Sequence, residues 1–181
     1  MIIGVFGLSG VGKTTICSEI HRNVNNVKRI SASDVIRMYG NSVKFEMLNQ
    51  SNVDANQLVL IKGIQQLKEE SKLNGGVTTY LLELHNVLET PSGLKEISIN
   101  IFRQLGLDEA IFLVKPASII VEQRQKDSQR KRVLATEKEL FAIQEQAIML
   151  FNSMFSQLDI PHEVVTNNHV EALTRVIYNS R

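Results

Sequence analysis

Eight residues near the amino terminus have the types and spacing of a phosphate-binding loop. The pattern G-x-x-x-x-G-K-[ST] is fitted by Gly7, Leu8, Ser9, Gly10, Val11, Gly12, Lys13 and Thr14. In such a loop the glycines let the backbone curl until successive N–H groups point at phosphate oxygens. Lys13 would bring a positive charge to the terminal phosphates, and the hydroxyl of Thr14 would face Mg²⁺. The motif therefore predicts a site for a polyphosphate and its magnesium ion.

The segments on either side of the loop support this interpretation. Residues 1–6 read MIIGVF, an apolar run without alternation, which is typical of a strand buried on both faces of a parallel sheet. A helical pattern then runs from Lys13 to about Arg22, so the positive end of its dipole would face the phosphates. The alternative is a glycine-rich turn that binds nothing. Because roughly one chain in a hundred or fewer should match the motif by chance, the context favours phosphate binding.

The rest of the chain alternates between strand-like and helix-like segments. Strands are expected at 27–31, 77–84, 110–114 and 163–166, and helices at 34–39, 55–72, 95–105, 117–127, 136–158 and 170–178. Ser33 is the expected cap of the helix at 34–39, and 85–93 is expected to be a loop because Pro91 and Gly93 interrupt it. The pattern predicts a three-layer α/β/α fold with a parallel five-stranded sheet, and a ligand beyond the carboxyl ends of its strands.

Helical spacing also predicts which side chains form the core. Leu58, Ile61 and Ile64 mark the apolar stripe of one long helix. A second long helix is expected to bury Phe141, Phe151, Met154 and Phe155, and Cys17 is expected to pack one turn into the helix after the loop.

Composition restricts the class of protein. The length of 181 residues suits one domain, and a net charge of +1 argues against a general nucleic-acid or membrane binder. No apolar run approaches the roughly 18 residues of a membrane helix. Cys17 is the only cysteine, so a reducing cytoplasm is the expected location. A GTPase would add D-x-x-G and N-K-x-D motifs, which do not occur, and ring-forming ATPases need a longer chain; a small kinase remains.

Four further stretches resemble the adenylate kinase family, most closely its short-lid, archaeal-type members. Residues 30–37 (ISASDVIR) are similar to the family's I-S-T-G-D-M-L-R, and 81–85 followed by 90–93 to its hydrophobic–D-T-H…T-P-x-G. Its R-x-x-D-x-x-R-x-R stretch is matched by Arg124, Asp127, Arg130 and Arg132, and its last strand and adjoining loop by 164–167. The resemblance implies a P-loop kinase domain over 1–181, with an acceptor-side helical segment at about 32–73 and a short lid at about 124–135.

The resemblance also implies an activity and roles for individual residues. The γ-phosphoryl group of Mg·ATP would pass to a nucleoside monophosphate, with AMP favoured. The residues that would bind ATP are Gly7, Leu8, Ser9, Gly10, Val11, Gly12, Lys13, Thr14, Thr15, Arg124 and Asn167, the last of them near the adenine. The acceptor would contact Ser31, Asp34, Arg37 and His85; Thr14 would hold Mg²⁺ directly and Glu83 through water. Lys13, Arg124, Arg130 and Arg132 would be the catalytic residues, the arginines closing over the triphosphate.

Several features leave alternatives open. The family's acceptor-binding R-D-x-x-R appears here as residues 53–57, VDANQ, without arginine. Ile148 stands where a second catalytic arginine is expected, and Glu83 replaces an aspartate. The basic stretch at 124–132 also fits a solvated helix end, and His85 an ordinary loop histidine. A kinase for another small acceptor, or an ATP-binding regulator with weakened catalysis, therefore remains an alternative to the nucleoside monophosphate kinase.

Overall fold

A parallel sheet of five strands forms the centre of the molecule. The computed structural model describes residues 1–40, 53–73, 78–90, 93–127 and 135–179. The sheet has the order β2-β3-β1-β6-β7, and every neighbouring pair in it is parallel. The strands are β1 (Ile2–Phe6), β2 (Val27–Ser31), β3 (Thr79–Glu83), β6 (Glu109–Leu113) and β7 (His162–Val165). The expected five-stranded parallel sheet is confirmed, with β1 at its centre.

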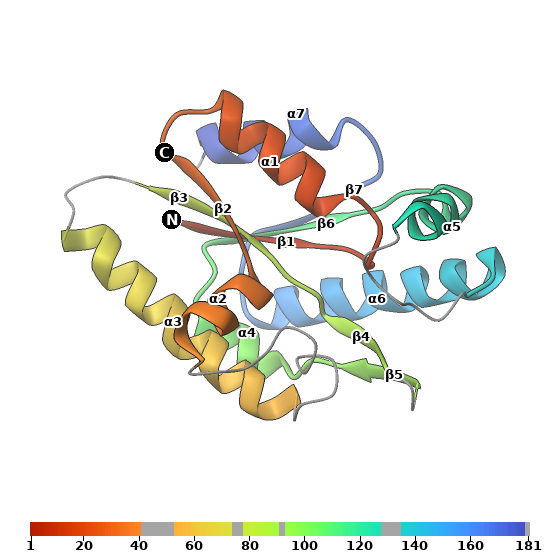
Figure 1. Cartoon of the computed structure of the whole chain (residues 1–181), viewed down its shortest axis with the longest axis horizontal. Helices are drawn as coiled ribbons and strands as arrows, with labels where there is room; N and C mark the ends of the chain where they lie inside the picture. The colour runs from red at the N-terminus through yellow and green to blue at the C-terminus, as the bar shows by residue number, and fades with distance from the viewer. Residues whose placement is uncertain (41–52, 74–77, 91–92, 128–134, 180–181) are drawn as a thin grey trace.

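Helices cover both faces of this sheet, as Figure 1 shows. On one side lie α1 (Lys13–Asn23) and α7 (His169–Asn179), which contact each other. On the other lie α3 (Val53–Leu73), α4 (Ile99–Leu105) and α6 (Glu137–Gln157). Two further helices, α2 (Ala32–Tyr39) and α5 (Ala117–Lys126), follow β2 and β6 at the carboxyl ends of those strands. The result is the three-layer α/β/α arrangement that the sequence predicts.

An aromatic cluster fixes the end of the central strand. Phe6, the last residue of β1, packs against Phe102, Phe151 and Phe155 with ring centroids 5.4, 5.3 and 5.1 Å away. All four side chains are fully buried. Rings at these separations add to the free energy of burial, so the backbone that enters the phosphate-binding loop starts from a fixed point.

Two side chains expected in the core are on the surface. Phe141 is 57% exposed and Leu58 is 58% exposed. In each case a neighbour, Leu140 or Leu60, is buried instead. Successive residues on a helix point about 100° apart, so a stripe that shifts by one or two positions turns an apolar side chain outward. Phe151, Met154, Phe155 and Cys17 are buried as expected.

The structure corrects the expected start of α2. Ser31, and not Ser33, is the cap: its hydroxyl accepts a hydrogen bond from the Asp34 N–H at 3.1 Å. The Asp34 carboxylate in turn accepts from the Ser31 N–H at 3.3 Å, which completes a capping box. The helix therefore begins at Ala32, directly after β2.

The segment expected to be a loop contains a hairpin. Strands β4 (Val87–Thr90) and β5 (Gly93–Glu96) pair antiparallel, with Val87 opposite Glu96 and Glu89 opposite Leu94. The hairpin follows β3 and lies at the same end of the sheet as α5 (Figure 1). Its four-residue strands are short, half of their residues are polar, and they lack the apolar run that makes β3 recognisable, so the sequence pattern alone does not predict the hairpin. The helix expected from Lys95 begins at Ile99, after the Ser98 cap.

Candidate phosphate-transfer site

The loop between β1 and α1 has a backbone that requires glycine. Gly7, Gly10 and Gly12 have φ values of 138°, 92° and 97°, in the region that side chains with a Cβ rarely adopt. At Gly10 space is also limiting, because a Cβ there would lie 3.0 Å from Cγ of Arg124. The loop is therefore curled as the motif predicts, with α5 packed closely against it.

Lys13 spans the loop that precedes it. Its Nζ donates hydrogen bonds to the carbonyl oxygens of Gly7 at 2.6 Å and Leu8 at 3.1 Å, and the residue is buried. The ammonium is therefore held against the first two residues of the loop. Phosphate oxygens are stronger acceptors than carbonyls, so this charge is placed to bind an incoming polyphosphate.

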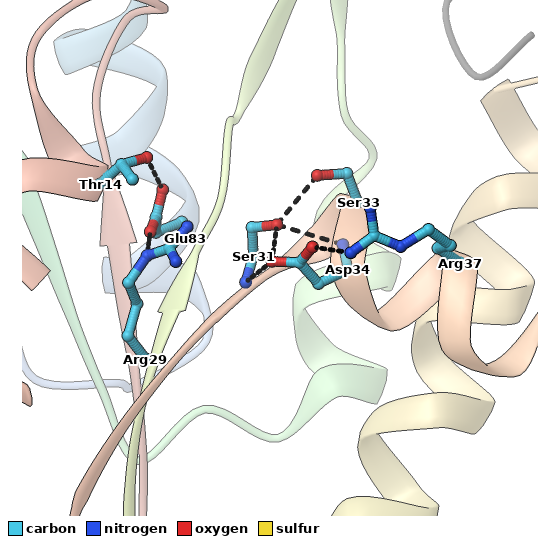
Figure 2. Close-up of polar contacts among 7 residues, drawn as sticks. All are labelled: Thr14, Arg29, Ser31, Ser33, Asp34, Arg37 and Glu83. Atoms are coloured by element: carbon cyan, nitrogen blue, oxygen red, sulfur yellow. Dashed lines mark hydrogen bonds and ion pairs between the residues drawn. The ribbon is translucent and has the colours of Figure 1, made fainter. Parts of the chain in front are cut away.

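Glu83 joins the loop to the neighbouring strands (Figure 2). Its carboxylate accepts a hydrogen bond from the Thr14 hydroxyl at 2.7 Å through Oε2, and one from Arg29 Nε at 2.5 Å through Oε1. Glu83 is 7% exposed, at the end of β3 beside β1. A carboxylate this deeply buried needs such partners, because an unpaired charge away from water costs several kcal/mol.

Arg29 is a site residue that sequence reasoning missed. It lies on β2, where it pairs with Leu81, two residues before Glu83 on β3. Alternate residues of a strand share a face, so the arginine and the carboxylate emerge on the same side of the sheet. The one available signal is a charged residue within a short expected strand, and it identifies no partner.

Thr14 and Glu83 have the chemistry of a magnesium site. Mg²⁺ takes oxygen ligands and is usually held by one or two protein groups together with phosphates and water. The hydroxyl of Thr14 and the carboxylate of Glu83 lie 2.7 Å apart at the end of the loop, so the donor set fits. Within the described ranges no group of three or more His, Cys, Asp or Glu side chains is placed to hold a metal.

Replacing Arg29 should show how strongly this network supports the fold. Arg29→Met should lower the free energy of unfolding by about 1–3 kcal/mol, because the buried Glu83 loses a charged partner. The matched control is Arg175→Met, since Arg175 also pairs with a glutamate, Glu163, but both of those side chains are about half exposed. That control should cost less than about 1 kcal/mol. Urea unfolding measures both, and equal losses would contradict a supporting role for Arg29.

Cys17 takes no part in this chemistry. Burial raises the pKa of its thiol to about 12, and the negative charge of Glu83 adds to the effect. The thiol therefore stays protonated near neutral pH and is a packing residue, as expected.

Arg124 lies against the loop as the sequence suggests, but it has partners that the sequence does not predict. Its Nε donates to the Ser9 carbonyl at 2.9 Å. Its Nη1 and Nη2 donate to the two carboxylate oxygens of Glu89 on β4, at 2.8 and 2.5 Å. Its expected contact with a triphosphate stays a prediction, and Arg130 and Arg132 lie outside the described residues.

The residues expected to bind the acceptor meet at the same edge of the sheet (Figure 2). Ser31 is paired with Glu83 in the β2–β3 register. Asp34 accepts hydrogen bonds from the Ser31 hydroxyl at 2.7 Å and from Arg37 Nη2 at 2.6 Å. Arg37 is exposed and His85, two residues after Glu83, is half-buried. The structure brings Ser31, Asp34 and Arg37 together beside the Thr14–Glu83 pair; their role in binding stays a prediction.

Two neighbouring cavities open beside the end of the loop and the first turn of α1. One of about 440 Å³ is lined by Gly12, Thr15 and Lys115, together with Gln123 and Asp127 from α5 and the residue that follows it. A second, of about 650 Å³, shares Lys115 and reaches Asn168 and α7. These volumes are typical of ligand sites. The expected place of a nucleotide base, near Asn167 and beside these cavities, stays a prediction. Asn167 is the exposed residue just before this second lining, and Lys115 is a lining residue that the sequence analysis missed.

None of the described helices has the length and hydrophobicity needed to cross a membrane.

Comparison with known proteins assigns the chain to a family. The family model described as "AAA domain" matches residues 6–140, well over half of the chain. Comparison with curated protein sequences finds no match. The fold is similar to shikimate kinase from Bacteroides thetaiotaomicron (TM-score 0.61, 14% identity, 98% of each chain covered). It is also similar to M. mycoides deoxyadenosine kinase with bound dATP (TM-score 0.59, 15% identity, 98% of this chain and 100% of that chain).

These findings support the phosphate-binding loop and the kinase fold, and they do not single out adenylate kinases. The chain belongs to the AAA domain family, and its fold is that of the P-loop kinases.

Proposed function

We propose that this protein is an ATP-dependent kinase that transfers the γ-phosphoryl group of Mg·ATP to a nucleoside monophosphate, with AMP favoured. The observation that carries the proposal is the hydrogen bond of 2.7 Å between Thr14 and Glu83. It joins the hydroxyl of a phosphate-binding loop to a strand-end carboxylate, and Ser31 and Arg37 lie on the adjoining strand and helix. Donor and acceptor groups would therefore meet at one edge of the sheet.

Phosphoryl transfer asks little covalent chemistry of the protein. It needs two substrates in line and positive charge around the migrating group. The loop N–H groups, the first turn of α1 and Lys13 would bind the donor phosphates, and Arg37 would hold the acceptor phosphate. Magnesium, when bound with ATP at Thr14 and Glu83, would neutralise charge on the phosphates. A monophosphate oxygen is already largely deprotonated at neutral pH, so this transfer requires no general base and His85 need not act as one.

A small molecule with a hydroxyl acceptor is the second candidate substrate. Arg37 is already paired with Asp34 and is more than half exposed, and Gln57 stands where the family has an arginine. An uncharged acceptor would need fewer arginines than a monophosphate does. Solved structures with this fold include a shikimate kinase and a deoxyadenosine kinase, which also favours testing hydroxyl acceptors.

One assay distinguishes these candidates. The protein is incubated with Mg·ATP and, separately, AMP, other nucleoside monophosphates, deoxynucleosides and shikimate, and ADP and the phosphorylated products are quantified by chromatography. We expect ADP to form with AMP in preference to the other acceptors. Turnover only with a nucleoside or shikimate would replace the proposal by the hydroxyl acceptor. Turnover with none, although ATP binds, would indicate the regulator.

Arg37→Ala tests the acceptor side separately. The KM for the acceptor should rise about 10- to 100-fold, because a charge-assisted bond to phosphate is lost. ATP affinity should change less than about twofold, since Arg37 lies on α2 and not at the loop. Arg103→Ala, an exposed arginine on α4, is the control and should change neither. Equal losses of acceptor and ATP affinity, measured by steady-state kinetics and calorimetry, would refute this role.

A further inference from the structure

Arg124 is a buried cation that bridges two parts of the structure. Its side chain is 4% exposed, and its three hydrogen bonds run to the Ser9 carbonyl and to both oxygens of the Glu89 carboxylate. Arg124 belongs to α5, Ser9 to the phosphate-binding loop and Glu89 to the β4–β5 hairpin. A guanidinium held at all three nitrogens has a fixed plane as well as a fixed position.

The guanidinium lies between the loop and the β4–β5 hairpin. The neighbouring α5 residues Gln123 and Lys126 line the cavity beside Gly12, where the base of a nucleotide would lie. Arg124 instead points to the hairpin that follows Glu83 and His85, and it packs against Gly10. Arg124 therefore lies beside Ser9 and Gly10 of the loop, on the side of the hairpin.

The Glu89 carboxylate has a specific effect on this arginine. A buried guanidinium needs a countercharge, and Glu89, 35 positions away in the sequence, supplies it. The Glu89 carboxylate binds Nη1 and Nη2 together and so fixes the orientation of the guanidinium plane. The single hydrogen bond from Nε to the Ser9 carbonyl would leave that plane free to rotate. Arginine has five N–H donors, so after three bonds two remain for a phosphate oxygen.

We propose that Glu89 is a positioning residue for phosphoryl transfer, which holds Arg124 so that its remaining donors face the terminal phosphate of ATP. The inference rests on the proposed function and deepens it. Glu89 touches no substrate; it acts through Arg124. The terminal phosphate is present in ATP and absent from ADP, so the effect of Glu89 should differ between the two nucleotides.

The experiment compares the affinities of the wild-type protein and of Glu89→Gln for Mg·ATP and Mg·ADP by calorimetry. Glutamine has nearly the same size but no charge and only one acceptor oxygen, so Arg124 loses its countercharge and one of its two hydrogen bonds to residue 89 while the packing is retained. We expect the Kd for ATP to rise about tenfold and the Kd for ADP to change less than about twofold. In the active enzyme kcat should fall at least as far. Glu89→Asp keeps the charge and should recover part of the ATP-over-ADP preference.

Glu122→Gln is the matched control. Glu122 is also paired with a cation, Lys126 on α5, but both side chains are exposed. This variant should keep the wild-type affinities for both nucleotides. Thermal unfolding of each variant confirms that the comparison is made between folded proteins.

The results that would overturn the inference are distinct from those that would overturn the proposed function. Equal weakening of ATP and ADP by Glu89→Gln would mean that Glu89 only supports the loop. Tighter binding of ATP would mean that Glu89 competes with phosphate for Arg124. Both results can be obtained from binding alone, even if the wild-type protein transfers phosphate to none of the acceptors tested, which would overturn only the proposed function. A wild-type protein that binds neither nucleotide would overturn both.

Discussion

Replacing Lys13 with alanine should abolish the thermal stabilisation that ATP gives to this protein. A ligand at 100 times its Kd stabilises a folded protein by about 2.7 kcal/mol, which for a chain of this size is a shift of several degrees. Lys13 is the charge that the loop encloses, bonded to the carbonyls of Gly7 and Leu8. Without it the triphosphate meets backbone N–H groups but no cation within the loop, and the expected shift falls to within about one degree.

The variant should remain folded, so the lost shift can be assigned to binding. Its two carbonyl partners stand in a loop at the edge of the sheet, and losing both bonds should cost on the order of 1–3 kcal/mol. Lys28→Ala is the control, because Lys28 is an exposed lysine on β2; it should keep the full ATP-dependent shift. Differential scanning fluorimetry with and without Mg·ATP measures all three proteins. A Lys13→Ala protein that still gains several degrees with ATP would show that ATP binds at another site.

The sequence predicts those parts of the site that are continuous in the chain. The loop from Gly7 to Thr14 is recognisable because a strand, a curled turn and a helix must follow one another directly, and each requirement leaves its own residue types. Ser31 and the strand-end Glu83 are also among the expected site residues, but through the family resemblance, and the sequence predicts Ser33 instead of Ser31 as the cap of α2. Local physics suffices only for the loop.

The partners of the charged residues could not be predicted in the same way. Arg29 is 54 residues from Glu83, and Glu89 is 35 residues from Arg124. The first pair depends on which strands are neighbours in the sheet. The second depends on a hairpin whose short strands have no clear sequence signature. A charged residue near a predicted site has many potential partners in the chain, and only the register and packing select one.

Glu83→Gln should remove most of the activity while leaving the site assembled. Glutamine has nearly the same shape: its carbonyl can accept the hydrogen bond from Arg29 and its NH2 group can donate to the Thr14 hydroxyl oxygen, but the negative charge at the end of β3 is gone. We expect turnover to fall about 10²- to 10³-fold, the usual loss when a preorganised electrostatic group at a reacting centre is removed. ATP affinity measured without magnesium should change little. Its enhancement by magnesium should be largely lost, because that enhancement depends on oxygen ligands at Thr14 and Glu83.

The contrast between the two magnesium conditions makes this prediction specific to Glu83. A general weakening of the fold would reduce ATP affinity with and without the metal alike, whereas loss of a metal-linked charge reduces only the difference between them. Glu163→Gln provides the control, since Glu163 is also a strand carboxylate paired with an arginine, on β7 and about half exposed. It should leave the magnesium titration unchanged. If Glu83→Gln kept the wild-type response to magnesium, Glu83 would be a structural partner of Arg29 alone, and the hydrogen bond to Thr14 could no longer support the proposed transfer.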